Sequence, residues 1–151
     1  MRFLGNIEAK TDAKGRAFLP AVFRKVLQAS SEECLVLRKD VFQKCLVLYP
    51  ESVWNERLDL LKTQLKPWKQ AHQQIFRQFV SEAEVVALDG NGRFLISKRL
   101  QKIAEIDQDI QFIGMDNTIE IWSPKNLQET FKPEEDFAIE FENIMNSDDA
   151  L

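Results

Sequence analysis

The chain has 151 residues, of which 44% are hydrophobic and 29% are charged, a balance typical of a folded globular protein. Its apolar runs, such as Val85–Leu88, are far shorter than the roughly 20 residues that a membrane-spanning helix requires. The N-terminus also becomes polar too early for a secretory signal, so we expect a cytoplasmic protein with no membrane partner.

The net charge of −4 is distributed unevenly along the chain. Residues 128–151 carry eight acidic side chains and one basic side chain, so residues 1–127 carry a net charge of +3. The acidic total therefore does not exclude a nucleic-acid partner for the first part of the chain. In the acidic tail, apolar residues recur at helical spacing from Phe137 to Met145, which predicts an amphipathic helix. Residues 147–151 are expected to fray.

In chain order, residues 6–12 predict a strand, because they include β-branched residues and partly alternate. A tight turn follows at Asp12–Gly15, since Asp can bond to the backbone two residues on and Gly supplies a positive φ. Residues 16–19 are predicted as the returning strand. Pro20 suits the first turn of a helix that runs to about Gln28.

A second predicted hairpin, residues 34–38 and 45–49, begins its two strands with Cys34 and Cys45. We interpret both cysteines as small buried hydrophobic residues, because a disulfide is not expected in a reducing compartment. With two cysteines and the single His72, a zinc site is not expected.

Residues 51–82 predict a helical connector, because their apolar residues recur at helical spacing. One helix is expected to end near Lys66, since Pro67 disfavours its continuation. A second helix is expected over residues 68–82, with a narrow apolar stripe.

The stretch Asp12–Arg16 recurs, altered, as Asp89–Arg93, at an offset of 77 residues. The same offset relates the apolar runs that follow and the helix starts at Pro20 and Ser97. A match that continues through turn, strand and helix indicates a duplicated structural unit. The second copy is completed by a predicted hairpin over residues 109–122.

No catalytic set appears in the sequence. It contains neither a nucleophile elbow nor a phosphate-binding loop, and no carboxylate is marked out by a motif as a general acid. We therefore expect no enzymatic activity, no catalytic residues and no cofactor, and the sequence identifies no small-molecule substrate.

The two turns carry the candidate binding residues. Lys14 and Arg16 lie at an exposed tip, and the planar guanidinium suits bidentate contact with phosphate or guanine. Arg93 is the equivalent of Arg16 in the second copy, where Lys98 and Arg99 are expected beside Arg93. The full candidate set for DNA binding is Lys14, Arg16, Arg24, Asn91, Arg93, Lys98 and Arg99.

A structural interpretation exists for the same turns. Asp12 and Arg16, like Asp89 and Arg93, can form an ion pair across the turn, and an exposed pair of this kind is worth only about 0–1 kcal/mol. The residues expected to shape the turns are Asp12, Gly15, Asp89, Gly90 and Gly92.

The doubled turn motif, its spacing and one outer strand together resemble a known family. The stretches that carry the likeness are Asp12–Arg16, Pro20–Arg24, Phe76–Arg77, Ala83–Glu84, Leu88–Asp89, Gly92–Ile96, Leu100, Phe112–Gly114 and Ile119–Trp122. Over roughly residues 1–127 the chain resembles the MraZ transcriptional regulators, whose halves are AbrB-like swapped-hairpin DNA-binding units.

The resemblance implies a bacterial, nucleoid-associated protein that binds double-stranded DNA at promoter repeats ahead of the division and cell-wall gene cluster, usually including its own gene. It also implies ring-shaped homo-oligomers, with Arg16 and Arg93 as the DNA-contacting arginines. Two departures matter: Ser97 replaces a proline, and Asn91 replaces a longer polar residue and leaves the second site less basic.

The expected fold is α+β and mostly β, with duplicated AbrB-like swapped-hairpin halves (double-psi-like small barrels) and peripheral helices. Residues 1–50 and 83–127 are the expected repeats, residues 51–82 the connector, and residues 128–151 the acidic helix and tail. The expected function is that of a sequence-specific DNA-binding transcription regulator. The alternative is a β-rich homo-oligomeric assembly or protein-interaction module that does not bind DNA, in which the two turn arginines pair with carboxylates of a neighbour.

Overall fold

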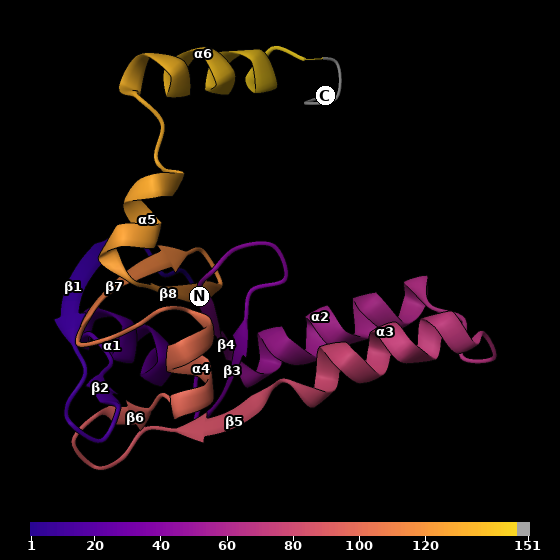
Figure 1. The fold of residues 1–151 in the computed structure, drawn as a ribbon, viewed down its shortest axis with the longest axis horizontal. Helices are drawn as coiled ribbons and strands as arrows, with labels where there is room; N and C mark the ends of the chain where they lie inside the picture. Colours follow the sequence, from indigo (N-terminus) through magenta and orange to yellow (C-terminus); the bar gives the residue numbers. More distant parts are fainter. Residues whose placement is uncertain (148–151) are drawn as a thin grey trace.

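The computed structural model describes residues 1–147, so most of the segment expected to fray, residues 148–151, lies outside the described range (Figure 1). In chain order its elements are β1 (Asn6–Lys10), β2 (Arg16–Phe18), α1 (Ala21–Ala29), β3 (Cys34–Lys39), β4 (Leu46–Pro50), α2 (Glu51–Gln64), α3 (Gln70–Ser81), β5 (Glu84–Ala87), β6 (Arg93–Leu95), α4 (Lys98–Ile103), β7 (Asp109–Met115), β8 (Thr118–Trp122), α5 (Pro124–Thr130) and α6 (Glu134–Met145).

Six of the strands form one antiparallel sheet in the order β1-β7-β8-β4-β3-β5, and the other two, β2 and β6, form a separate ribbon. The N-terminal strand β1 pairs with β7 of the second copy, while β5 pairs with β3 of the first. Each copy therefore gives one strand to the outer hairpin of the other copy, as swapped hairpins require. The α+β class is confirmed, and the sheet forms the body although the helices contain more residues than the strands.

The exchange overturns one expectation about the first turn. Residues 16–19 do not return along residues 6–12, because β2 pairs with β6 instead. In this ribbon Ala17 lies opposite Phe94, its own counterpart at the offset of 77 residues. The two copies are thus related by a pseudo-twofold axis that passes through the ribbon. Pairing across this axis turns Ala17 and Phe94 inward, where both are buried.

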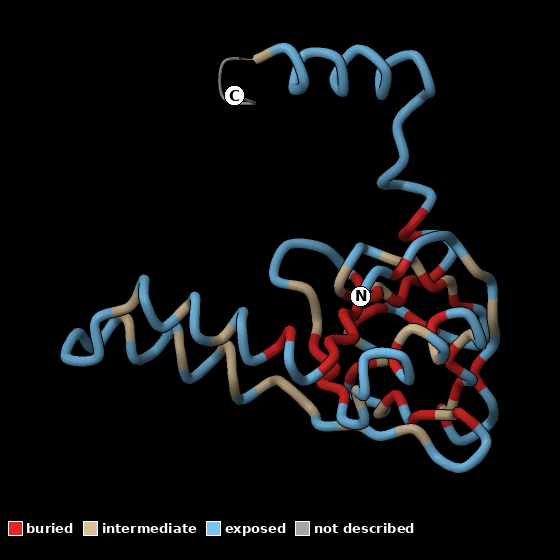
Figure 2. Tube along the Cα trace, turned by 180° about the vertical axis from the view of Figure 1, so that it is seen from behind, coloured by how far each residue is buried: buried red, intermediate tan, exposed pale blue. Residues whose placement is uncertain are grey.

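The hydrophobic core lies between the large sheet, the β2–β6 ribbon and the helices α1 and α4 (Figure 2). Its fully buried residues come from both copies and include Phe3, Phe23, Phe94 and Phe112. The rings of Phe3 and Phe23 meet edge to face at 5.6 Å, a geometry that adds to the area they bury. In the ribbon, Phe94 of β6 meets Phe112 of β7 with ring centroids 6.3 Å apart, so the ribbon packs against the large sheet.

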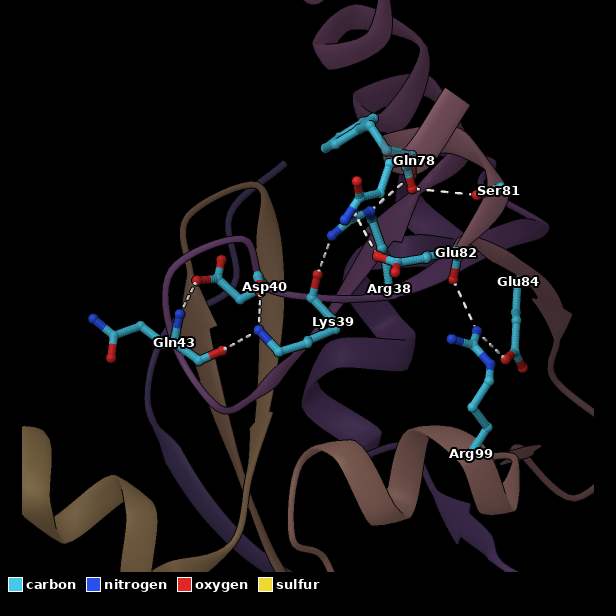
Figure 3. Close-up of polar contacts among 10 residues, drawn as sticks. Arg38, Lys39, Asp40, Gln43, Gln78, Ser81, Glu82, Glu84 and Arg99 are labelled. Atoms are coloured by element: carbon cyan, nitrogen blue, oxygen red, sulfur yellow. Dashed lines mark hydrogen bonds and ion pairs between the residues drawn. The ribbon is translucent and has the colours of Figure 1, made fainter. Parts of the chain in front are cut away.

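Helices α2 and α3 form an antiparallel pair that projects from the body, as Figure 1 shows. Trp54 at the base of α2 stacks on Phe79 of α3 with ring centroids 5.3 Å apart. The buried Arg38 donates from Nε to the carbonyl oxygen of Phe79 at 2.8 Å and from Nη2 to Glu82 at 3.1 Å (Figure 3). These contacts join the end of α3 to strand β3.

The two cysteines differ in environment. Cys45 is fully buried, as expected, but Cys34 is exposed at the start of β3, so the expectation that both are buried is wrong for Cys34. Cys34 lies opposite Ala87 at the end of the β3–β5 ladder and remains exposed there. Among the described helices, none is both long and apolar enough to cross a bilayer.

Candidate nucleic-acid interface

The first turn is organised by a single carboxylate. Oδ1 of Asp12 accepts hydrogen bonds from the backbone N–H groups of Lys14 and Arg16, each at 2.9 Å. Oδ2 accepts from Nε of Arg16, also at 2.9 Å. Gly15 completes the turn with a φ of +84°, a conformation that is costly for residues with a Cβ.

The second turn repeats this geometry. Oδ1 of Asp89 accepts from the backbone N–H groups of Asn91 and Arg93 at 2.9 Å, and Oδ2 accepts from Nε of Arg93 at 2.9 Å. Gly92 has a φ of +82°. By contrast, the φ of Gly90 is outside the left-handed region and no atom lies near its missing Cβ, so the structure shows no need for glycine at that position.

Both turn carboxylates are held in the charged form. The backbone N–H of Arg16 is the main group that lowers the pKa of Asp12, and the backbone N–H of Arg93 does the same for Asp89. Hydrogen bonds to an ionised carboxylate favour that form. At neutral pH each Asp therefore bonds to its arginine as an ion.

The ion pair expected from the structural interpretation is present in both turns, but it occupies only part of each guanidinium. Nε of Arg16 and of Arg93 is bonded to the aspartate, and no hydrogen bond within residues 1–147 uses the terminal amino groups. The side chains of Arg16 and Arg93 remain 34% and 24% exposed. Each aspartate thus orients an arginine whose outer nitrogens face solvent.

The outer face of the β2–β6 ribbon carries both arginines. Arg16 lies opposite Leu95, and Phe18 lies opposite Arg93, while the alternate pair between them points into the core. Phe18 and Leu95 are each more than half exposed, and the guanidinium carbon of Arg93 is 5.8 Å from the centre of the Phe18 ring. Neither apolar residue is among the binding residues predicted from the sequence, although their two-residue spacing from the arginines was a usable signal.

Each turn packs against the other copy. The backbone N–H of Leu19 donates to the carbonyl oxygen of Gly92, and that of Ile96 donates to the carbonyl oxygen of Gly15. Arg24 in α1 consequently lies behind the second turn, with Nη1 only 2.2 Å from the position of a Cβ on Gly92. Arg24 therefore adds a positive charge to the turn that has Asn91 in place of lysine.

The structure also reassigns the two basic residues at the start of α4. Both residues were expected beside Arg93, but Lys98 lies at the first turn, where it lines a hollow of about 380 Å³ together with Lys14 and Gly15. The cause is the exchange of strands between the two copies. It brings the start of α1 to the second turn and the start of α4 to the first turn. The site at the first turn therefore carries more positive charge than the residues of the first copy alone supply.

Arg99 faces away from the turns. Its Nη2 donates to the carboxylate of Glu84 at 2.6 Å and to the carbonyl oxygen of Glu82 at 3.0 Å (Figure 3). Unlike Arg16 and Arg93, whose carboxylate partners lie within the turns, Arg99 is paired with residues outside them. Within residues 1–147, no group of three His, Cys, Asp or Glu side chains could hold a metal ion.

Two regions of the chain, residues 2–75 and 79–146, match the family model described as "MraZ protein, putative antitoxin-like". The chain belongs to the MraZ family. The two matched regions also agree with the duplication seen in the sequence, and the resemblance drawn from the turn motifs is confirmed.

Relatives with the name transcriptional regulator MraZ are similar over nearly the full length. The protein from Phocaeicola vulgatus is 64% identical, covering 97% of this chain and 96% of its own. The protein from Bacteroides thetaiotaomicron is 58% identical, covering 98% and 95%. That from Bacteroides fragilis (strain YCH46) is 55% identical, covering 98% and 94%. The MraZ relationship therefore extends into the acidic C-terminal region.

Proposed function

We propose that this MraZ family member is a DNA-binding transcription regulator that reads the major groove with the outer face of its β2–β6 ribbon. The observation that carries the proposal is the pair of solvent-facing arginines, Arg16 and Arg93, each oriented by an aspartate of its own turn. The major groove admits a two-stranded β-ribbon, and arginine bidentate to guanine is the commonest specific base contact there.

The ion pairs support recognition rather than compete with it. Because Nε is bonded to Asp12 or Asp89, the two terminal amino groups of each arginine point outward as a preformed fork. A fork held in place loses less side-chain entropy on binding, so the aspartates act as supports for the contacting residues. Lys14, Lys98 and Arg24, placed beside the two turns, are the proposed phosphate contacts, which fix position without reading sequence.

Few phosphate contacts per subunit imply weak binding by one subunit alone. Non-specific complexes typically have dissociation constants of about 10⁻⁴ to 10⁻⁶ M at physiological salt. We therefore infer a homo-oligomeric ring whose subunits engage successive promoter repeats, so that effective concentration raises the affinity. The proposed targets are repeats upstream of the division and cell-wall gene cluster, including the protein's own gene, which would make it nucleoid-associated.

The direct test is a salt titration of binding to duplex DNA from immediately upstream of the protein's own gene, beside a scrambled duplex. Specific binding that weakens steeply with salt is expected for the native duplex alone. Arg16→Ala combined with Arg93→Ala should weaken it at least about tenfold, because a good bidentate pair contributes roughly 1–3 kcal/mol. Arg2→Ala, which removes an exposed arginine paired with Asp116, is the matched control and should bind like wild type.

A duplex with a single repeat should bind far more weakly than one with several repeats. Equal binding of the two would contradict the multivalent ring while leaving recognition by the ribbon intact. Absence of binding to either sequence at low salt would favour the second candidate, an assembly or protein-interaction module. The observation favouring that candidate is the exposed pair Phe18 and Leu95 on the ribbon face, which could equally meet an apolar protein surface.

A further inference from the structure

Helix α6 stands apart from the rest of the chain. In Figures 1 and 2 it is separated from both the body and the α2–α3 hairpin, and it is joined to α5 only by residues 131–133. None of its twelve residues is buried. Four of them form one apolar face at spacings i, i+4, i+7 and i+8, each between 53% and 66% exposed: Phe137, Phe141, Ile144 and Met145.

Such a helix needs a surface that covers it. Isolated helices shorter than about 12–15 residues are marginal in water, and most helical stability in proteins comes from packing of the apolar face. The three acidic residues of its first turn, Glu134–Asp136, interact favourably with the helix dipole, but that effect is screened by salt. The exposed aromatic and aliphatic face is therefore the part of α6 that lacks its partner.

The α2–α3 hairpin carries a groove of complementary character. Its volume is about 500 Å³, and no acidic residue lines it. Its walls combine apolar and basic side chains, chiefly Leu65, Phe76, Val80, Lys62, Lys66 and Arg77. Helix α6 carries five acidic residues and no basic one. An apolar helix face with acidic flanks thus matches an apolar groove with basic flanks.

We propose that α6 of one copy docks in the α2–α3 groove of a second copy of this chain. The groove lies toward the outer end of the hairpin, around Leu65 to Pro67. The three-residue connection before α6 spans at most about 10 Å, and α5 is anchored by the buried Leu127. Figure 1 shows α6 lying apart from the α2–α3 hairpin of its own chain, and this short connection limits its movement, so the proposal takes a neighbouring subunit as the source of the helix.

The contact is head-to-tail, because the donated surface differs from the accepting one. Contacts of this type generate rings when the rotation between subunits closes. The proposal rests on the homo-oligomer inferred above and names the joint between its subunits. It does not involve the ribbon, so DNA binding by one subunit on a single repeat is independent of it.

The first experiment measures the mass of the full chain by light scattering over a dilution series. Phe137→Ala combined with Phe141→Ala should raise the dissociation constant of the assembly about tenfold or more, since buried aromatic residues dominate interface energetics. Ile139→Ala is the matched control, because Ile139 is equally exposed but lies on the opposite face of α6. A double variant that dissociates no more readily than wild type would overturn the proposal.

Charge-reversal variants then test whether α6 docks in this groove and whether the helix comes from another chain. Lys62→Glu with Lys66→Glu, and separately Glu140→Lys with Glu142→Lys, should each dissociate the assembly. A mixture of the two variants should regain the wild-type mass, because each helix then meets a groove of opposite charge on the other chain. Failure of the mixture to reassemble, as docking within one chain requires, would overturn the proposal.

The same measurements separate this joint from the function proposed above. A wild-type chain that is monomeric at every concentration would remove both the ring and the joint, yet leave single-repeat DNA binding to be measured. An assembly that persists in the α6 and groove variants would remove the joint alone. In either case, circular dichroism should show that the sheet body is still folded, since α6 buries none of its residues against it.

Discussion

The two turn glycines are equivalent in the internal repeat but face different neighbours, and this difference leads to a quantitative prediction. A Cβ on Gly15 would lie 2.8 Å from the carbonyl oxygen of Ile96 and 2.2 Å from Nε2 of Gln101. For a Cβ on Gly92, the three nearest atoms all belong to the side chain of Arg24, the closest at 2.2 Å. A backbone carbonyl cannot move aside, whereas a long side chain can.

The magnitudes follow from these contacts. Alanine in the left-handed conformation costs about 1–2 kcal/mol at either position. Gly15→Ala adds overpacking against Ile96, which typically costs about 1–3 kcal/mol, for a total of roughly 2–5 kcal/mol. Gly92→Ala should cost only about 1–2 kcal/mol, because Arg24 can adopt another rotamer. Gly15→Ala is therefore the more damaging change.

Urea unfolding of the full chain at equal protein concentration tests the difference, because oligomers gain apparent stability with concentration. With a slope of about 1–3 kcal/mol per molar urea, the two midpoints should differ by roughly 1 M. Gly90→Ala is the control and should be nearly neutral, since its φ is ordinary and no atom lies within 4 Å of the added carbon. Equal midpoints for Gly15→Ala and Gly92→Ala, or the reverse order, would refute the reasoning.

Two further predictions concern stability. Arg38→Met should lower the free energy of unfolding by about 1–3 kcal/mol, because it leaves the carbonyl oxygen of Phe79 without its 2.8 Å hydrogen bond; a chemical denaturation midpoint equal to that of wild type would contradict this. Because the pKa values of Asp12 and Asp89 are lowered, these carboxylates contribute to the free energy of unfolding at neutral pH. That contribution is lost as the pH falls below 3.8, the ordinary pKa of an aspartate. Between about pH 5 and about pH 2.5, wild type should therefore lose more stability than the double variant Asp12→Asn with Asp89→Asn, and an equal loss would show that the two carboxylates have ordinary pKa values.

The turns were predictable from the sequence because their causes are local. The side chain of Asp12 bonds to backbone groups two and four residues on, and the glycine at position 15 supplies the positive φ that closes the turn. The helix start at Ser97 was predictable for the same reason, since its hydroxyl accepts from the N–H of Leu100. Each of these features depends on a few neighbouring residues.

The partners of the strands and the grouping of the charges were not predictable in this way. Strand β1 has the pattern of a half-buried strand whichever neighbour it pairs with, and only the packing of the whole body selects β7. The position of Arg24 behind the second turn follows from that exchange, so its helical phase alone could not reveal it. The pairing of Arg99 with Glu84 likewise joins two elements whose contact is set by the tertiary fold.

The exchange of strands also constrains the order in which the chain can fold. Asn6 in β1 bonds to Gln111 in β7, which is 105 residues later in the sequence. During synthesis the first copy therefore emerges with β1 and β2 lacking their partners, and neither ladder can close until β6 and β7 have been translated. Because long loops must be closed before such contacts form, folding should be slow relative to proteins rich in local contacts. A nascent chain of this kind exposes unpaired strand edges, and its N-terminal half would be stable only if a second half were supplied to it.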